Sequence, residues 1–191
     1  MLRPRRTAFT LLEIILVMAV IVILAAVTYP SLDAMYGQSR AIAGADAFKA
    51  AMLTARAQAV EEGVPYRVTL VSGKGNFRVA PDLDAYWSGN AVPQKSESDN
   101  RSIIWEEHLP KGVLFSESDE PVQVDRDAET FTDPATAAVS AYKAVAVFLP
   151  DGTARDDYKV LLCSYGGTPL WVTLRSLTGE VNITRYQERG R

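Results

Sequence analysis

The sequence predicts an α+β fold in which one long N-terminal helix packs on a C-terminal antiparallel β-sheet head. Three observations lead to this prediction. Residues 14–27 form an unbroken apolar run, residues 45–59 carry apolar side chains at helical spacing, and the periodicity changes to two after Pro65. The 191 residues, 48% of them hydrophobic and 23% charged, suit one globular domain with an appendage.

The first element expected is a membrane-spanning helix over residues 9–29. At about 1.5 Å per residue, a helix of this length rises roughly 30 Å, which matches the hydrocarbon core of a bilayer. Arg3, Arg5 and Arg6 precede the helix, and the positive-inside rule keeps such residues on the cytoplasmic side. We therefore expect a single pass, with the C-terminal part of the chain exported across the membrane.

Glu13 is a carboxylate near the start of this otherwise apolar helix. Burying a charged side chain in lipid costs on the order of 3 kcal/mol, so a compensating group is needed. The helix dipole helps slightly, and a positive group on a neighbouring chain would help far more. An ammonium at Phe9, exposed by cleavage in an adjacent subunit, would be such a group. The alternative is that Glu13 marks the interfacial end of an ordinary anchor helix.

The residues around Glu13 resemble a known processing site. Residues 8–13 read AFTLLE after a short basic leader, residues 1–8, and this is similar to the cleavage and methylation site of type IV pilins and type II secretion pseudopilins. The resemblance implies a pilin-like fold, cleavage between Ala8 and Phe9 by a prepilin peptidase, and methylation of Phe9. It also implies that Glu13 aids docking into a filament and that the helix bends at Pro30. Ala8 departs from the glycine that is usual before the cut.

A secretory signal peptide is the competing interpretation of the N-terminus, with a small-residue cleavage site near residues 25–27. An ordinary signal has no acidic residue ahead of its apolar core. It also needs no amphipathic helix behind it, and one is expected here. These two differences favour the pilin-type site.

The helix is expected to continue as an amphipathic segment over residues 30–62. Gly63 and Pro65 follow it, and both are typical of a helix end. Such a long continuous helix is unusual in a globular protein and ordinary in a pilin spine. The apolar stripe of this segment consists of Ala45, Phe48, Met52, Ala55 and Ala59.

Residues 63–191 are expected to form the β-rich head. Strands at 66–71 and 76–79 flank a turn of serine, glycine and lysine, as in a hairpin. Later strands are predicted at 143–149, 159–165, 170–174 and 180–184. The bulky core candidates among them are Trp171, Leu174 and Val181.

The C-terminal part resembles the head of the GspH/FimT group of minor pseudopilins. The segments that carry this resemblance are VFLPDG at 147–152, LWVTL at 170–174 and TGEV at 178–181, and with the N-terminus it covers roughly residues 5–75 and 143–185. DNA-binding members resembling FimT carry a Gly-Arg-x-Arg pattern near the last strand. Here the pattern reads Gly179-Glu180-Val181-Asn182, which lacks both arginines, so only Arg185, Arg189 and Arg191 remain nearby.

The region of about residues 81–141 is expected to be a variable insertion, with short strands at 103–105 and 112–115. It resembles no family known to us. Its acidic residues have a spacing that could gather calcium ligands, but no glycine makes the sharp turn of a calcium loop. We therefore expect no metal there. The residues concerned are Asp125, Asp127, Glu129 and Asp133.

Composition excludes several classes of protein. His108 and Cys163 are the only residues of their kinds, so the sequence has no internal disulfide, no cysteine-based zinc site and no histidine-rich metal site. The net charge of −3 becomes −6 without the three arginines of the leader, which argues against a nucleic-acid partner. We expect no catalytic residues and no cofactor. An enzyme tethered by an uncleaved anchor is the alternative that these observations disfavour.

The resemblance implies a structural role in the inner membrane, with the head in the periplasm. We expect a minor pseudopilin of a type II secretion system, which assembles into a pseudopilus that aids protein export. The alternative is a minor type IV pilin involved in pilus initiation, adhesion or DNA uptake. The partners expected are other pilin or pseudopilin subunits, the prepilin peptidase and an inner-membrane assembly platform.

Overall fold

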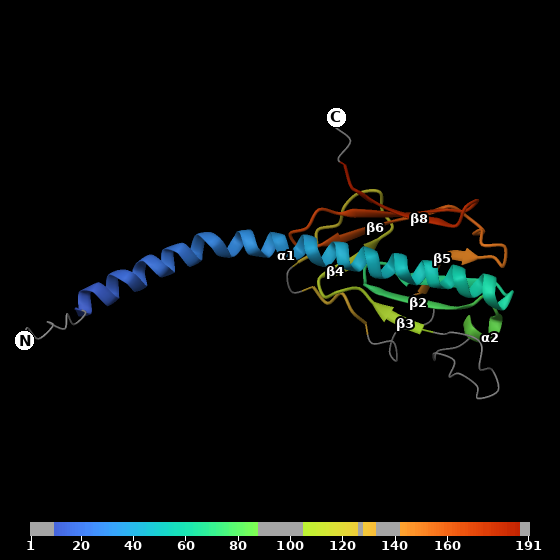
Figure 1. Ribbon diagram of the computed structural model, residues 1–191, viewed down its shortest axis with the longest axis horizontal. Helices are drawn as coiled ribbons and strands as arrows, with labels where there is room; N and C mark the ends of the chain where they lie inside the picture. The colour runs from blue at the N-terminus through green and yellow to red at the C-terminus, as the bar shows by residue number, and fades with distance from the viewer. Residues whose placement is uncertain (1–9, 88–104, 126–127, 133–141, 188–191) are drawn as a thin grey trace, which may run out of the picture.

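The computed structural model describes residues 10–87, 105–125, 128–132 and 142–187, without the side chains of residues 27–35 and 85. Its spine is helix α1 (Leu11–Glu62), which has 52 residues. One half of α1 projects from the molecule and the other half lies along the head (Figure 1). The α+β class and the long N-terminal helix predicted from the sequence are confirmed.

Both ends of α1 follow from local sequence. Thr10 precedes the helix with extended backbone angles (φ −82°, ψ 150°), and its side-chain oxygen accepts a hydrogen bond from the Glu13 N–H group. At the other end, Gly63 takes the left-handed conformation (φ 69°), and its N–H group bonds to the Ala59 carbonyl. A side chain at this backbone angle is disfavoured, so glycine ends the helix where the sequence predicted it.

The head contains two four-stranded sheets, where the sequence predicted one. The first has the order β3-β2-β1-β5 and the second β4-β6-β7-β8, with antiparallel pairing throughout. The single short helix of the described head is α2 (Asp84–Trp87). The strands are β1 (Tyr66–Val71), β2 (Asn76–Pro81), β3 (Trp105–His108), β4 (Val113–Ser116), β5 (Tyr142–Phe148), β6 (Tyr158–Ser164), β7 (Leu170–Arg175) and β8 (Glu180–Arg185).

The region predicted as an insertion, residues 81–141, is part of the head's framework. Its strand β3 pairs with β2 at the edge of the first sheet, and its strand β4 pairs with β6 at the edge of the second. Leu109, Val113 and Phe115 from this region are buried in the main core. Short strands were predicted here at 103–105 and 112–115, and the structure has β3 and β4 at Trp105–His108 and Val113–Ser116, while the description of the region as a variable insertion stays a prediction.

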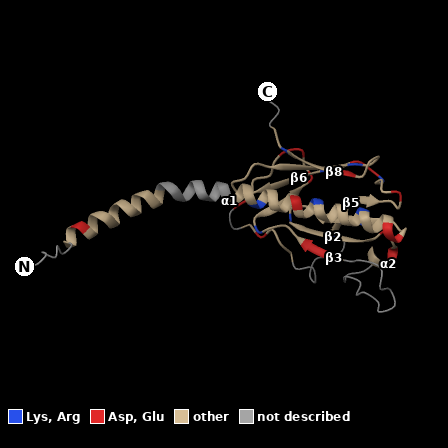
Figure 2. Cartoon of the chain, in the orientation of Figure 1, with Lys and Arg blue, Asp and Glu red and all other residues tan. Residues whose placement is uncertain are grey.

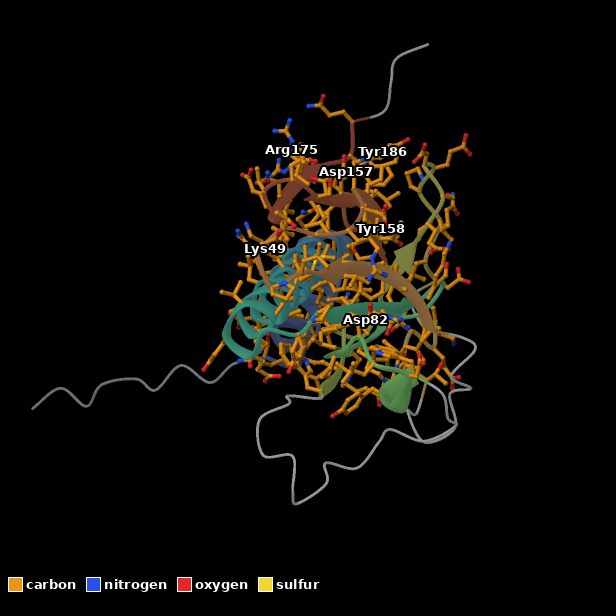
Figure 3. All side chains as sticks on the ribbon, turned by 90° about the vertical axis from the view of Figure 1, so that its right-hand side faces the viewer. Lys49, Asp82, Asp157, Tyr158, Arg175 and Tyr186 are labelled. Atoms are coloured by element: carbon orange, nitrogen blue, oxygen red, sulfur yellow. The ribbon has the colours of Figure 1, made fainter. Side chains whose placement is uncertain are left out.

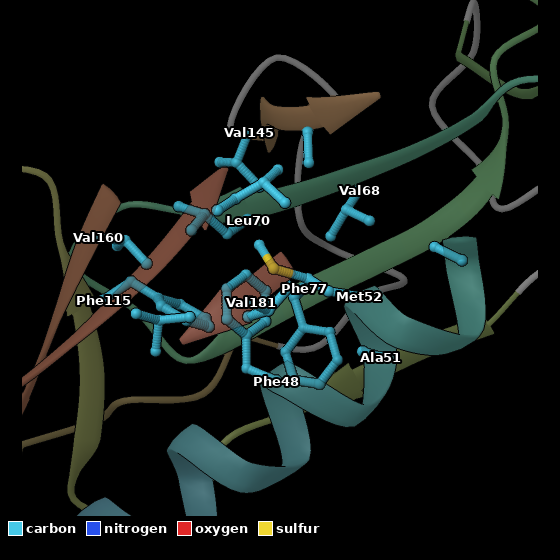
Figure 4. Close-up of a cluster of buried hydrophobic side chains, with 14 of the residues drawn as sticks. Phe48, Ala51, Met52, Val68, Leu70, Phe77, Phe115, Val145, Val160 and Val181 are labelled. Carbon is cyan, nitrogen blue, oxygen red and sulfur yellow. The ribbon is translucent and has the colours of Figure 1, made fainter. Parts of the chain in front are cut away.

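The core lies between α1 and the two sheets. The apolar stripe predicted on the helix, from Ala45 to Ala59, is buried there. Phe48 of α1 packs edge to face on Phe77 of β2 and Phe115 of β4, with ring centroids 5.4 Å and 4.7 Å apart (Figure 4). These three rings connect the helix to both sheets.

Two of the three predicted core residues of the C-terminal strands lie in this core. Leu174 and Val181 are buried in it, as expected. Trp171 is not, because neighbouring residues of a strand point to opposite faces and β7 turns Leu170, Val172 and Leu174 inward. Trp171 instead lies on the outer face, where it is partly buried against a second, smaller hydrophobic cluster and Lys159 stacks over its ring at 5.1 Å.

Arg78 is a buried cation on the outer side of the first sheet. Its side chain is 2% exposed and pairs with Glu106 of β3 at 2.5 Å. Its guanidinium also stacks on the ring of Tyr142, 4.7 Å from the centroid. Burial, together with the nearby Glu106 carboxylate, raises the pKa of Tyr142 to about 12. This cluster joins three strands of one sheet, β2, β3 and β5.

Candidate functional site

The projecting half of α1 presents an uncovered apolar surface. We call its described residues, 10–26, the arm. Figure 2 shows one acidic position on the arm and no basic one. The large apolar side chains there have exposed fractions from 45% at Val17 to 78% at Leu11. They are Leu11, Leu12, Ile14, Ile15, Leu16, Val17, Met18, Val20, Ile21, Val22, Ile23 and Leu24.

Exposure of this kind identifies the arm as an interaction surface. Monomeric soluble proteins rarely expose a contiguous apolar patch of more than a few hundred Å². Burial of such surface contributes roughly 25 cal/mol per Å², so covering the arm is strongly favourable. The chain's own head leaves the arm bare (Figure 1). The arm therefore needs lipid, another protein chain, or both.

Glu13 lies in the first turn of α1, at the outer end of the arm. Its N–H group bonds to the side chain of Thr10 (3.3 Å), and its side chain is exposed. Among the residues that the structure describes, no cation forms an ion pair with its carboxylate. Thr10 and Glu13 have the spacing of a capping box. Because Glu13 lies in the first turn, its negative charge also interacts favourably with the positive end of the helix dipole. This T-x-x-E pattern could have predicted the start of the helix from the sequence.

The other predicted site residues are not tested by the structure. Ala8 and Phe9 lie outside the described residues. Pro30 lies within the range of α1, and the bend expected there stays a prediction. In the described part of the chain, no helix has both the length and the apolar character that crossing a bilayer requires. The predicted span of residues 9–29 stays a prediction as well.

The head begins to hold α1 at Gly37. The Ser164 hydroxyl donates to the Gly37 carbonyl (3.1 Å), and the Thr168 N–H group donates to the Gln38 side chain (2.8 Å). A Cβ atom added at Gly37 would overlap the carbonyl oxygen of Tyr165. Only glycine allows this close approach of the helix to the turn between β6 and β7. No local pattern could have predicted this contact, because it joins residues far apart in the chain.

The far end of α1 is fixed by a second set of contacts. Arg56 donates to the Gly152 carbonyl (2.7 Å) in the turn between β5 and β6. Gly152 has a positive φ of 83° and Gly179 one of 62°, and the Arg56 side chain packs against both glycines. Helix α1 is thus held by turns at both ends of the head. This arrangement makes it a rigid support for the arm.

We call these two ends of the head the base and the tip. The base is the end where α1 leaves, and it contains the turns at residues 72–75, 109–112 and 165–169. The tip is the opposite end, and it contains the turns at 149–157 and 176–179. Figure 3 looks onto the tip, where Asp82 pairs with Arg67 and Arg155.

The structure brings no catalytic or metal-binding set together among its described residues. No group of three or more His, Cys, Asp or Glu side chains there could hold a metal ion. Asp125 and Glu129 are exposed, while Asp127 and Asp133 lie outside the described residues. His108 is exposed and packs on the ring of Phe131, at 4.7 Å between centroids.

Two further predicted features concern Cys163 and the C-terminal arginines. Cys163 is a free, buried thiol whose pKa is raised by burial, so it stays protonated at neutral pH. Arg185, at the end of β8, is exposed. Arg189 and Arg191 lie outside the described residues.

Comparisons with known proteins identify a family motif at the N-terminus of the chain. Residues 3–29 match the family described as the prokaryotic N-terminal methylation motif. A search of curated proteins gives no significant match. Two solved structures of the minor pseudopilin EpsH from the type II secretion system of Vibrio cholerae are similar. The first is 13% identical with a TM-score of 0.45, covering 76% of this chain and 97% of that one. The second is 15% identical with a TM-score of 0.48, covering 80% and 99%.

The match at residues 3–29 spans the predicted cleavage site and the whole arm. The structure adds a long helix packed on antiparallel sheets, which is the fold class that the resemblance implied. The chain therefore combines a prokaryotic N-terminal methylation motif with an α+β head.

Proposed function

We propose that the chain is a structural minor pseudopilin of a type II secretion system. One observation carries the proposal: the methylation motif at residues 3–29 contains the arm, whose apolar surface the head leaves uncovered. A secreted enzyme does not require such an arm. A filament subunit requires it first as a membrane anchor and then as the surface that packs against neighbouring subunits. The head serves as the outer part of the subunit.

The proposed sequence of events starts at the N-terminus. A prepilin peptidase cuts between Ala8 and Phe9 on the cytoplasmic side and methylates the new amine of Phe9. The arm then anchors the subunit in the inner membrane, with the head in the periplasm. During assembly, the carboxylate of Glu13 pairs with the Phe9 ammonium of a neighbouring subunit. This pairing neutralises both charges as they leave the membrane surface for an apolar filament interior.

The role of Glu13 is tested by Glu13→Gln. This change removes the charge and keeps the backbone N–H group that Thr10 caps, so α1 still forms. We expect membrane retention to be unchanged and incorporation into filaments to fall about tenfold or more, since 1.4 kcal/mol of lost pairing energy changes an equilibrium tenfold. Incorporation is measured by cross-linking of the variant to other subunits in membranes and filaments.

Glu61→Gln is the matched control, because Glu61 is an exposed carboxylate at the opposite end of the same helix. It should assemble as the unaltered chain does. Normal assembly of Glu13→Gln would remove the ion-pair role and leave Glu13 as an interfacial marker of an anchor helix.

A minor type IV pilin is the second candidate, because the methylation motif is common to both classes. Deletion of the gene distinguishes them. Loss of protein export with intact surface motility supports the secretion role. Loss of motility or DNA uptake with intact export supports the pilus role.

A further inference from the structure

The base of the head contains an uncharged hollow of about 320 Å³. It is lined by residues 121–124 and 163–167 and by Pro169, none of which has a side chain charged at neutral pH. Cys163 belongs to this lining, and burial raises the pKa of its thiol, so it adds no charge. An ionic ligand thus finds no counter-charge in the hollow.

This hollow lies beside the point where α1 leaves the head. Gly37 packs directly against Tyr165 and Gly167, which are part of the hollow's lining. Gly37 follows Tyr29, the end of the predicted span, by eight residues, or about 12 Å along a helix. The headgroup layer on each side of a bilayer is roughly 5–8 Å thick, and membrane helices tilt by about 20° on average. On an upright helix the base would lie about 4–7 Å beyond this layer, and a tilt toward the head lowers the base toward it.

Two apolar side chains are exposed to solvent at the base. Val122, in the lining of the hollow, is 47% exposed, and Phe131 is 46% exposed. Phe131 is held at the base because the carbonyl of its neighbour Thr130 accepts a hydrogen bond from the Gly75 N–H group. Both positions can place an apolar group among lipid headgroups and upper acyl chains, as aromatic and aliphatic residues do in interfacial segments.

The charged residues at the base do not favour a partner of either charge. Lys111 and Lys74 lie there, but the Lys74 ammonium already donates to the Glu129 carbonyl. Asp125 and Glu129 carry exposed carboxylates on the same segment as Phe131. With both signs present at the base and no charged side chain lining the hollow, we take apolar contact as the main interaction.

We propose that the base is a lipid-contact surface, which rests on the periplasmic face of the bilayer and inserts Val122 and Phe131 into its headgroup layer. The partner is the phospholipid interface itself, recognised by apolar contact and not by charge. The contact fixes the tilt and rotation of the whole subunit relative to the bilayer before the subunit enters a filament. This inference rests on the proposed function, because it requires the arm to anchor the chain in a membrane.

The test uses the full chain, processed at Phe9, in phosphatidylcholine nanodiscs with and without phosphatidylglycerol. A fluorophore is placed at the base through Gln123→Cys and at the tip through Leu177→Cys, where Leu177 is 84% exposed. Buried Cys163 should take no label, which the unaltered chain verifies. A lipid with a nitroxide on its headgroup then quenches each dye. We expect several-fold stronger quenching at 123 than at 177, and no dependence on phosphatidylglycerol or salt.

A second variant distinguishes lipid contact of the base from simple proximity of the base to the bilayer. Phe131→Ser should lower the quenching at position 123, whereas Leu83→Ser, at an equally exposed position of the tip, should leave it unchanged. Equal quenching at 123 and 177, or no effect of Phe131→Ser, would overturn the lipid contact while leaving the anchor intact. A chain that is not retained in nanodiscs at all would instead overturn the anchor, and with it the proposed function.

Discussion

Arg78 shows at the level of a single residue how the head depends on a buried charge. The alternation of β2 places it on the outer face of the sheet, where a polar side chain is ordinary, so no local pattern predicted its burial. Trp87 of α2, Glu106 of β3 and Tyr142 of β5 surround it in the fold. Each comes from a different part of the chain, which is why the site could not be foreseen.

Replacement of Arg78 by methionine should destabilise the head by about 3–5 kcal/mol, because Glu106 would keep a charge that is largely buried and has lost its partner. The measurement is urea unfolding followed by near-ultraviolet circular dichroism. Lys143→Met is the control, since Lys143 pairs with Glu117 while its own side chain is 63% exposed. That change should cost about 1 kcal/mol or less. Equal effects of the two variants would contradict the importance given to the buried pair.

At the scale of elements, local pattern predicted most of the strands. The segment 66–71 was predicted as a strand and is β1, and the C-terminal strands agree to within a residue at each end. The alternation of apolar residues and the glycines of the turns are local patterns, so they can be recognised without knowledge of the fold. The division into two sheets is different, because it depends on pairing between distant segments such as β1 with β5 and β4 with β6.

The contact of α1 with the turn between β6 and β7 gives a prediction for Gly37. Alanine normally stabilises a helix by about 1 kcal/mol relative to glycine. At position 37, however, its methyl group would overlap the Tyr165 carbonyl, and forcing such an overlap costs typically 1–3 kcal/mol. We therefore expect Gly37→Ala to destabilise the contact and to speed amide hydrogen exchange in residues 164–168.

Gly44→Ala serves as the control on the same helix, because its added Cβ atom would lie 3.2 Å from the Pro110 ring, which can shift. Its hydrogen exchange at residues 164–168 should stay as in the unaltered chain. Faster exchange in both variants, or in neither, would show that the turn does not depend on close approach at Gly37.

At the scale of the whole molecule, the chain divides into an N-terminal part that contains the arm and a part that packs in the head, and the described contacts of α1 with the head start at Gly37. A fragment of residues 37–191 keeps every helical core residue among the described side chains, the first of which is Ala41. It loses the arm and with it the main exposed apolar surface. We expect this fragment to be monomeric and folded by size-exclusion chromatography and circular dichroism.

A fragment of residues 49–191 is the matching test of the core. It lacks Ala41, Ala45 and Phe48, and therefore the ring that contacts both Phe77 and Phe115. It should aggregate or fail to fold. Aggregation of the longer fragment as well would mean that the head needs more of α1 than its described contacts indicate.

The pilin-type pathway itself is tested most directly by the N-terminus of the mature chain. The chain is extracted from membranes of a host that contains a prepilin peptidase, and its intact mass and N-terminal sequence are determined. A chain that begins at N-methylated Phe9 is the predicted result. A chain that begins near Thr28, or that keeps Met1, would contradict the filament function and leave a secreted or simply anchored β-rich domain.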